Sequence, residues 1–190
     1  WANSQVVIIT GPRIELAVTL IDRIKGLFPN KPFETKNTVV QLASCRIEAF
    51  PSHHLDTARG LPNVKFIFLD EADFFPVGQQ EDARAVAERY IAKSDPHILM
   101  VSTPNLPGGL FETIEKEKSC LYERLQLHYK TGIGTIYSQE EIDTAKQSPH
   151  FKREYELQYG IGIGNIFPYQ IIDQIIEDYD LELKDGEKCL

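Results

Sequence analysis

The sequence predicts an α/β fold in which a mostly parallel sheet is flanked by helices. Residues 64–69 form an apolar run without polar alternation, which is typical of a strand buried on both faces of a parallel sheet. Residues 97–101 form a second such run. Between them, residues 79–94 carry apolar side chains at helical spacing, namely Ala83, Val86, Ala87, Tyr90 and Ile91. Strand, helix and strand then make a crossover that brings the carboxyl ends of both strands to one edge of the sheet.

The segments before this crossover predict two further strand regions and a helix. Residues 5–10 have the composition of a strand, and Gly11-Pro12 separates them from an amphipathic helix. The apolar positions of that helix are Ile14, Leu16, Ala17, Leu20, Ile21, Ile24 and Leu27. Residues 38–42 and 45–50 also have strand composition, and the short link between them predicts a hairpin or a bent pair.

The segments after residue 104 predict mainly helices. Residues 110–118 form a helix behind a glycine turn, and residues 122–129 alternate well enough to predict an outer strand. Ser138 and Glu141 make a capping box that begins another helix. The helices predicted beyond this strand cover residues 138–146, 149–159 and 171–179. We expect one core domain over residues 1–160 and a C-terminal extension over residues 161–190.

The composition excludes several classes of protein. The 190 residues carry 20 Lys and Arg against 28 Asp and Glu, a formal net charge of −8, so any contact with DNA must be local. Three cysteines without a CxxC spacing favour free thiols over a disulfide framework or a zinc site. No apolar run approaches the roughly 20 residues of a membrane span, so we expect a cytoplasmic protein without membrane contact.

Two adjacent acids, Asp70 and Glu71, follow the first apolar run. Asp70 can hold a hydrated Mg²⁺, and Glu71 can orient or deprotonate a water for attack on a phosphate. The alternative for these two residues alone is an ordinary turn with Asp70 as a helix cap. Ser102 and Thr103 follow the second run, just before Pro104. Polar groups therefore follow both strands, which favours a phosphate site of the Walker B type over the simple turn.

These motifs resemble a known family. Residues 66–72 together with residues 99–104 resemble the Walker B and coupling motifs of the P-loop ATPases in viral and phage terminase large subunits, the motors that package DNA into procapsids. Residues 59–60, an Arg-Gly pair, resemble the pair that many terminases carry ahead of Walker B. Residues 151–155 and 164–167 resemble the segment that leads toward the terminase nuclease domain. The resemblance covers most of the chain and rests on the order and spacing of the motifs.

The resemblance implies a P-loop NTPase-like fold of the additional-strand, catalytic-glutamate class, with ATP and Mg²⁺ as cofactors. It implies that Asp70 holds Mg²⁺ through water and that Glu71 is the catalytic residue that activates the hydrolytic water. Ser102 and Thr103 would sense the γ-phosphate and couple hydrolysis to DNA movement, and Arg59 would contact a phosphate or the acids. The implied partners are double-stranded DNA, the terminase small subunit, the portal and further copies in a ring, inside the host cell of a virus or provirus.

The sequence departs from this family at the phosphate loop. No GxxxxGK[ST] occurs in the chain, and residues 11–13 lack the lysine and hydroxyl that contact phosphate and Mg²⁺. We therefore expect residue 1 to lie downstream of a Walker A loop, a nuclease domain to follow residue 190, and this chain alone to be inactive as an ATPase. Two alternatives stay open. One is a DEAD-box-like helicase or remodelling ATPase, because residues 70–73 read Asp-Glu-Ala-Asp, and the other is a non-catalytic scaffolding domain with the same fold.

Overall fold

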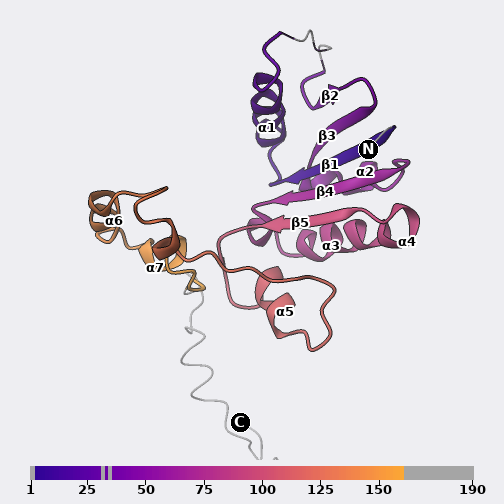
Figure 1. Cartoon of the computed structure of the whole chain (residues 1–190). Helices are drawn as coiled ribbons and strands as arrows, with labels where there is room; N and C mark the ends of the chain where they lie inside the picture. The colour runs from indigo at the N-terminus through magenta and orange to yellow at the C-terminus, as the bar shows by residue number, and fades with distance from the viewer. Residues whose placement is uncertain (1–2, 31–32, 34–35, 161–190) are drawn as a thin grey trace, which may run out of the picture. The chain divides into compact units, whose positions relative to one another are not determined.

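Five strands form one sheet in the order β2-β3-β1-β4-β5 (Figure 1). The computed structural model describes residues 3–30, 33 and 36–160. The strands are β1 (Ser4–Thr10), β2 (Val39–Gln41), β3 (Cys45–Pro51), β4 (Val64–Asp70) and β5 (His97–Val101). The neighbours β3, β1, β4 and β5 run parallel, and β2 pairs antiparallel with β3. The predicted mostly parallel sheet is therefore confirmed, and of the two arrangements predicted for residues 38–50, a hairpin or a bent pair, the structure has the hairpin.

Helices form in each described segment where the periodicity predicts one, but the segment predicted over 79–94 is divided into two helices and the last described helix is much shorter than predicted. They are α1 (Ile14–Gly26), α2 (Leu55–Ala58), α3 (Gln79–Arg89), α4 (Ile91–Ser94), α5 (Leu110–Lys116), α6 (Gln139–Ala145) and α7 (Phe151–Glu154). Short 3-10 helices are η1 (Ser52–His54), η2 (Ala72–Phe74) and η3 (Tyr129–Gly132). The predicted crossover runs from β4 through α3 and α4 to β5. Within the described part of the chain, no helix has the length and apolar character needed to cross a membrane.

Helices cover both faces of the sheet, and successive residues of β1 therefore enter two different cores. Val7 and Ile9 belong to a core that also contains Val86 of α3. Ile8, between them, belongs to a second core that contains Ile21 of α1. This alternation is the two-residue period of a strand. It explains why the sequence of β1 is a continuous apolar run, since both of its faces are buried.

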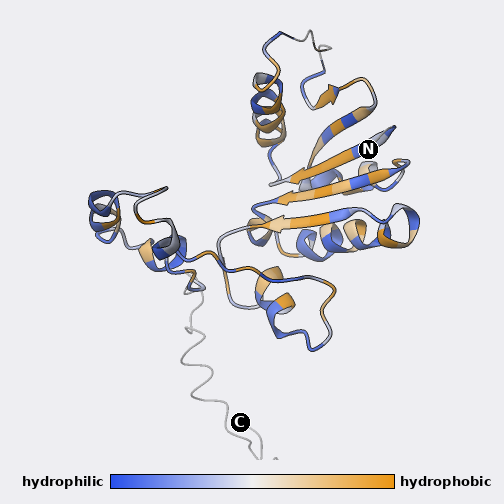
Figure 2. Ribbon diagram, viewed as in Figure 1, coloured by the Kyte–Doolittle hydropathy of each residue, from blue (hydrophilic) through white to orange (hydrophobic). Residues whose placement is uncertain are grey.

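β5 lies at an edge of the sheet, where its only ladder among the described residues is with β4 (Figure 1). Ile98 and Met100 pack against the core on the α3 side. Leu99 and Val101 face the other way and are 46% and 45% exposed. Figure 2 shows that hydrophobic residues continue to the carboxyl end of this edge strand. In this part of the chain β5 therefore has both an unpaired edge and an uncovered apolar face.

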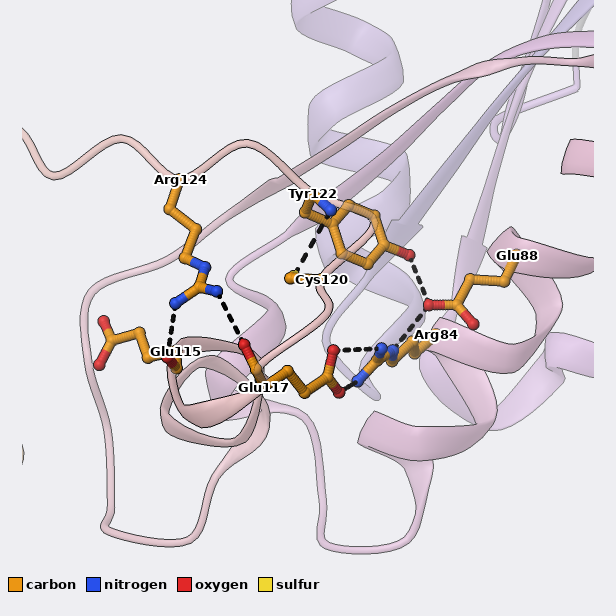
Figure 3. Close-up of polar contacts among 7 residues, drawn as sticks. All are labelled: Arg84, Glu88, Glu115, Glu117, Cys120, Tyr122 and Arg124. Carbon is orange, nitrogen blue, oxygen red and sulfur yellow. Dashed lines mark hydrogen bonds and ion pairs between the residues drawn. The ribbon is translucent and has the colours of Figure 1, made fainter.

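The outer strand predicted over residues 122–129 is wrong. These residues are irregular as far as η3, and side chains rather than a backbone ladder fix the start of the segment (Figure 3). The Tyr122 hydroxyl donates to Glu88 Oε1 at 3.0 Å, and the Arg124 guanidinium donates to the Glu117 carbonyl at 3.2 Å. The exposed fractions of Leu121, Leu125 and Leu127 are 71%, 80% and 67%. The alternation thus comes from polar side chains that bind α3 and the end of α5, with intervening leucines left in solvent.

The last described helices agree with the prediction only in part. Ser138 Oγ accepts the N–H of Glu141 at 3.2 Å, and the Glu141 carboxylate accepts the N–H of Ser138 at 2.7 Å, so the predicted capping box is confirmed. α7 is shorter than predicted, because Leu157 has a left-handed backbone with φ 56° and a helix cannot continue through it. Three predictions lie outside the described residues, namely the helix over 171–179, the motif at 164–167 and the extension over 161–190.

Candidate functional site at the ends of β4 and β5

The carboxyl ends of β4 and β5 bring the predicted acids and a predicted hydroxyl together. Asp70, the last residue of β4, is in register with Val101, the last residue of β5. Glu71 and Ser102 are the next residues along the chain, and Ser102 Oγ donates a hydrogen bond to Glu71 Oε2 at 3.1 Å. A carboxylate that accepts such a bond is held in a defined orientation. The structure thus gathers Asp70, Glu71 and Ser102 at one edge of the sheet.

Glu71 has a left-handed backbone, with φ 54° and ψ 45°. This region costs a residue with a Cβ atom about 1–2 kcal/mol, and such residues gather at functional sites. The conformation turns the chain sharply from β4 into η2, where the N–H of Phe74 donates to the Glu71 carbonyl at 3.0 Å. The turn leaves the Glu71 side chain exposed. The candidate base therefore combines access to solvent water with a backbone that its surroundings must hold in place.

A cavity of about 290 Å³ opens beside the acids, between α1 and the ends of β1 and β4. Asp70, Glu71, Thr10 and Arg23 contribute polar groups to its wall. Burial raises the pKa of the Asp70 carboxyl, and the positive charge of Arg23 acts in the opposite direction. A cation bound to a partly buried carboxyl favours the ionised form and so offsets the effect of burial. The Asp70 carboxylate can therefore bind a cation at this edge of the sheet.

Asp73 is a buried acid that the sequence singles out only as the last letter of Asp-Glu-Ala-Asp. Its side chain is 0% exposed. Its Oδ2 accepts the N–H of Asn105 at 2.6 Å, and its Oδ1 accepts the N–H of Phe111 at 3.0 Å. Burial raises the pKa of Asp73, against the lowering effect of these two donors. The one signal in the sequence is Gly109 in the glycine turn. A glycine permits another group to approach the backbone closely, but the sequence does not say that this group is Asp73.

Thr103 and Arg59 do not join the acids in this structure. Thr103 Oγ1 donates to Glu154 Oε2 of α7 at 3.5 Å, so it contacts α7 and not Glu71. Arg59 follows α2, before the chain enters the amino end of β4, and its Nε lies 3.3 Å from Asp56 Oδ1. The nucleotide-sensing role of Thr103 and the phosphate or acid contact of Arg59 stay predictions.

The oxygen donors at this edge fit a divalent cation that is shared with a phosphate. Within the described residues, no cluster of three or more His, Cys, Asp or Glu side chains is arranged to hold a metal by itself. Mg²⁺ prefers hard oxygens and usually takes one or two carboxylates, with waters and phosphate oxygens completing its shell. Asp70 supplies one such carboxylate and leaves Glu71 beside it available to a water. His53 and His54 lie with ring centroids 4.1 Å apart and belong to no such cluster.

Comparison with known proteins finds similarity in structure but not in sequence. The chain matches no protein-family model and no curated protein. The large terminase of a thermophilic bacteriophage matches with a TM-score of 0.56 and 14% identity, over 80% of this chain and 40% of that chain. The same terminase in complex with ADP matches with a TM-score of 0.59 and 12% identity, over 82% and 40%. The ATPase domain of the Thermus phage P74-26 large terminase, as a mutant, matches with a TM-score of 0.52 and 16% identity, over 84% and 78%.

These identities are too low to carry function from one protein to the other, so the likeness concerns the fold. The chain spans 40% of the length of the first terminase and 78% of the P74-26 ATPase domain. The parallel sheet, the crossover from β4 to β5 and the flanking helices all lie within the described residues. The chain therefore has the P-loop NTPase-like fold of the ATPase domain of phage large terminases.

Proposed function

We propose that this chain is part of an ATPase motor that couples ATP hydrolysis to the movement of double-stranded DNA, as in a packaging terminase. The observation that carries the proposal is the 3.1 Å hydrogen bond between Ser102 Oγ and Glu71 Oε2, beside Asp70 at the end of β4. Two neighbouring strands thereby supply a cation-binding acid, a candidate base and a hydroxyl. The fold shared with the thermophilic phage terminase, which was solved in complex with ADP, supports a nucleotide as the ligand.

In this proposal each polar residue has its own role. Mg²⁺, when bound, neutralises charge on the phosphate oxygens and so favours attack by water. Asp70 holds that cation through water from its partly buried carboxylate. Glu71 is exposed and can accept a proton from a solvent water. Ser102 keeps the Glu71 carboxylate oriented before hydrolysis and changes its own hydrogen bond when Glu71 turns to the water.

The loop that cradles the phosphates has to come from outside these 190 residues, since their sequence has no GxxxxGK[ST]. Such a loop lies at the carboxyl end of a parallel strand. β4 already has β1 and β5 as neighbours, and among the described strands β5 has no second ladder partner, so its outer edge beside Ser102 is the open position. We expect a strand of the native polypeptide to pair there, and its helix to cover the exposed Leu99 and Val101.

The experiment that tests this function measures ATP binding and hydrolysis by the native polypeptide that contains this chain. Glu71→Gln keeps the size of the side chain but removes the base, so we expect hydrolysis to fall by at least about 100-fold while ATP still binds. Glu81→Gln, an exposed acid at the start of α3, is the matched control and should hydrolyse ATP normally. Normal hydrolysis by Glu71→Gln would show that another group is the base.

A second measurement separates the proposed motor from its alternatives. Movement along double-stranded DNA without strand separation, driven by ATP, supports a packaging motor. ATP-driven strand separation would instead favour the DEAD-box-like alternative, and failure of the native polypeptide to bind ATP would favour a scaffolding domain. The small subunit, the portal and a ring of copies stay predictions that co-assembly experiments can test.

A further inference from the structure

We infer that Asp73 is a positioning residue that fixes Glu71 and joins the acidic turn to the loop after β5 and to α5. The catalytic part of this inference rests on the proposed function. Asp73 lies in η2, two residues after Glu71, and its side chain is completely buried. It does not line the cavity beside the acids. Its effect on a reaction must therefore pass through the residues that it holds.

The Asp73 side chain fixes both ends of the loop between β5 and α5. Its Oδ2 accepts the N–H of Asn105 at 2.6 Å, at the start of the loop. Its Oδ1 accepts the N–H of Phe111 at 3.0 Å, in the first turn of α5. Gly109 packs directly against this carboxylate, since a Cβ atom there would lie 2.7 Å from Asp73 Oδ1. One buried carboxylate thus ties two points of the chain that follow β5.

Gln80 of α3 completes this set of contacts. Its Nε2 donates to the carbonyls of Asp73 and Phe75, both at 2.9 Å, and its Oε1 accepts the N–H of Leu110 at 2.9 Å. We call Asp73, Gln80, Ser102, Asn105 and Phe111 the Asp73 network. Asp73 is buried and its partners are partly buried. The paired network resists rearrangement, because breaking one of its bonds leaves a poorly solvated polar group without its partner.

The backbone of Asp73 also directs the hydroxyl of Ser102. The N–H of Asp73 donates to Ser102 Oγ at 3.3 Å. A hydroxyl carries a single hydrogen, and Ser102 Oγ uses it to donate a hydrogen bond to Glu71 Oε2 at 3.1 Å. Because the bond from Asp73 occupies an acceptor position of the oxygen, it favours the rotamer in which the proton faces Glu71. The side-chain bonds of Asp73 to Asn105 and Phe111 hold this N–H in place, so Asp73 orients the candidate base through Ser102.

α5 extends the connection away from the site. Arg84 of α3 forms a two-pronged ion pair with Glu117, the residue after α5, in which Nη2 and Oε2 are 2.9 Å apart (Figure 3). The start of α5 is held by Asp73, and its end is held by Arg84. A displacement of Glu71 and Ser102 must therefore either move the loop and α5 with it or break these bonds.

Kinetics on the native polypeptide test the catalytic part of this inference. In Asp73→Asn the new amide turns a donor toward one of the two N–H groups, so we expect kcat to fall about 10- to 100-fold with the nucleotide Kd unchanged. Ser102→Ala should also lower kcat, and adding Asp73→Asn to it should cost much less than in the wild type, since the effect passes through Ser102. Asp82→Asn, an exposed acid of α3, is the control. Independent losses in the double variant, or a change in Kd alone, would overturn the positioning role.

Hydrogen exchange on the 190-residue chain tests the physical link without any need for ATPase activity. We expect the amides of Asn105 and Phe111 to exchange at least about tenfold faster in Asp73→Asn, with the amides of β1 unchanged. Exchange no faster than in Asp82→Asn would overturn the link, even in an active polypeptide. Absence of ATP hydrolysis in the native polypeptide would refute the proposed function and leave this result decisive. If Asp73→Asn does not fold, both experiments use Asn105→Ala instead. This variant removes only the side-chain donor to the Asp73 carbonyl.

Discussion

Replacing Gly109 by alanine should destabilise the folded chain through the Asp73 carboxylate. Gly109 has φ −70°, which alanine adopts without strain, so an effect of the substitution comes from the added methyl group. That methyl would lie 2.7 Å from Asp73 Oδ1 and 3.0 Å from the Leu106 carbonyl oxygen. Both oxygens are closer than ordinary contact, and the carboxylate is buried and bonded, so it cannot swing away freely.

The magnitude follows from three contributions. Forcing a methyl group into a packed site costs about 1–3 kcal/mol. Displacing the carboxylate weakens its bond with the N–H of Phe111, which adds about 1 kcal/mol. Alanine also reduces the entropy of the unfolded chain, and this stabilises the protein by about 0.4–1 kcal/mol. The free energy of unfolding should therefore fall by about 2 kcal/mol.

Urea unfolding followed by far-ultraviolet circular dichroism measures this change. Gly60→Ala is the matched control, because nothing lies within 4 Å of a Cβ atom at Gly60, and it should change stability by less than about 1 kcal/mol. If Gly109→Ala is as stable as Gly60→Ala, the carboxylate does not occupy the space next to Gly109 and the reasoning fails. Combining Gly109→Ala with Asp73→Ala should cost less than the sum of the two, since the second change removes the atoms that clash with the first.

Further predictions concern the core, a helix cap and a titrating group. Leu69→Ala in β4, at a position that is 0% exposed, should lower the free energy of unfolding by about 2–5 kcal/mol, whereas Leu125→Ala, at 80% exposure, should change it by less than about 0.5 kcal/mol in the same urea experiment. Ser138→Ala removes half of the capping box of α6 and should raise the hydrogen-exchange rates of that helix, in line with a local loss of about 1 kcal/mol. Burial raises the pKa of Asp73 above its ordinary value of 3.8, so the folded chain binds this proton more readily than the unfolded chain does. Relative to Asp73→Asn, the wild type should therefore gain stability as the pH falls toward 3.8 and lose that gain as the pH rises through the folded pKa, which urea unfolding at several pH values can detect.

The elements that sequence reasoning placed correctly are those with strong local signals. β4 is a continuous apolar run that ends in two acids, and α3 carries its apolar residues at helical spacing. A strand, a helix and a second strand of this kind form a parallel crossover, which predicts that Asp70 and Ser102 lie at the same edge of the sheet. The register of β4 with β5 agrees. Each of these steps needs only the sequence near one element and a general rule of α/β topology.

The features that sequence reasoning missed depend on contacts between distant segments. Residues 122–129 alternate like a strand, yet they form no ladder with any of the described strands. Instead, the Tyr122 hydroxyl donates to Glu88, 34 positions away. Asp73 looked like one letter of a motif, yet its carboxylate binds Asn105 and Phe111, which lie 32 and 38 positions further on. A local pattern cannot name such partners, because they are chosen by the packing of the whole domain.

The strain at Glu71 shows why the Asp73 network matters to the candidate site. The left-handed backbone of Glu71 costs about 1–2 kcal/mol, and a single exposed hydrogen bond from Ser102 contributes only about 0.5–1.5 kcal/mol in return. That bond alone does not hold the turn with any margin. The two bonds of the Asp73 carboxylate do, because this residue is buried and breaking them leaves its charge unpaired in the core. The candidate base is therefore positioned by η2 and by the loop after β5, both of which the Asp73 carboxylate holds. Its contact with Ser102 is then free to break and form again in each cycle of hydrolysis without loss of the turn that aims it.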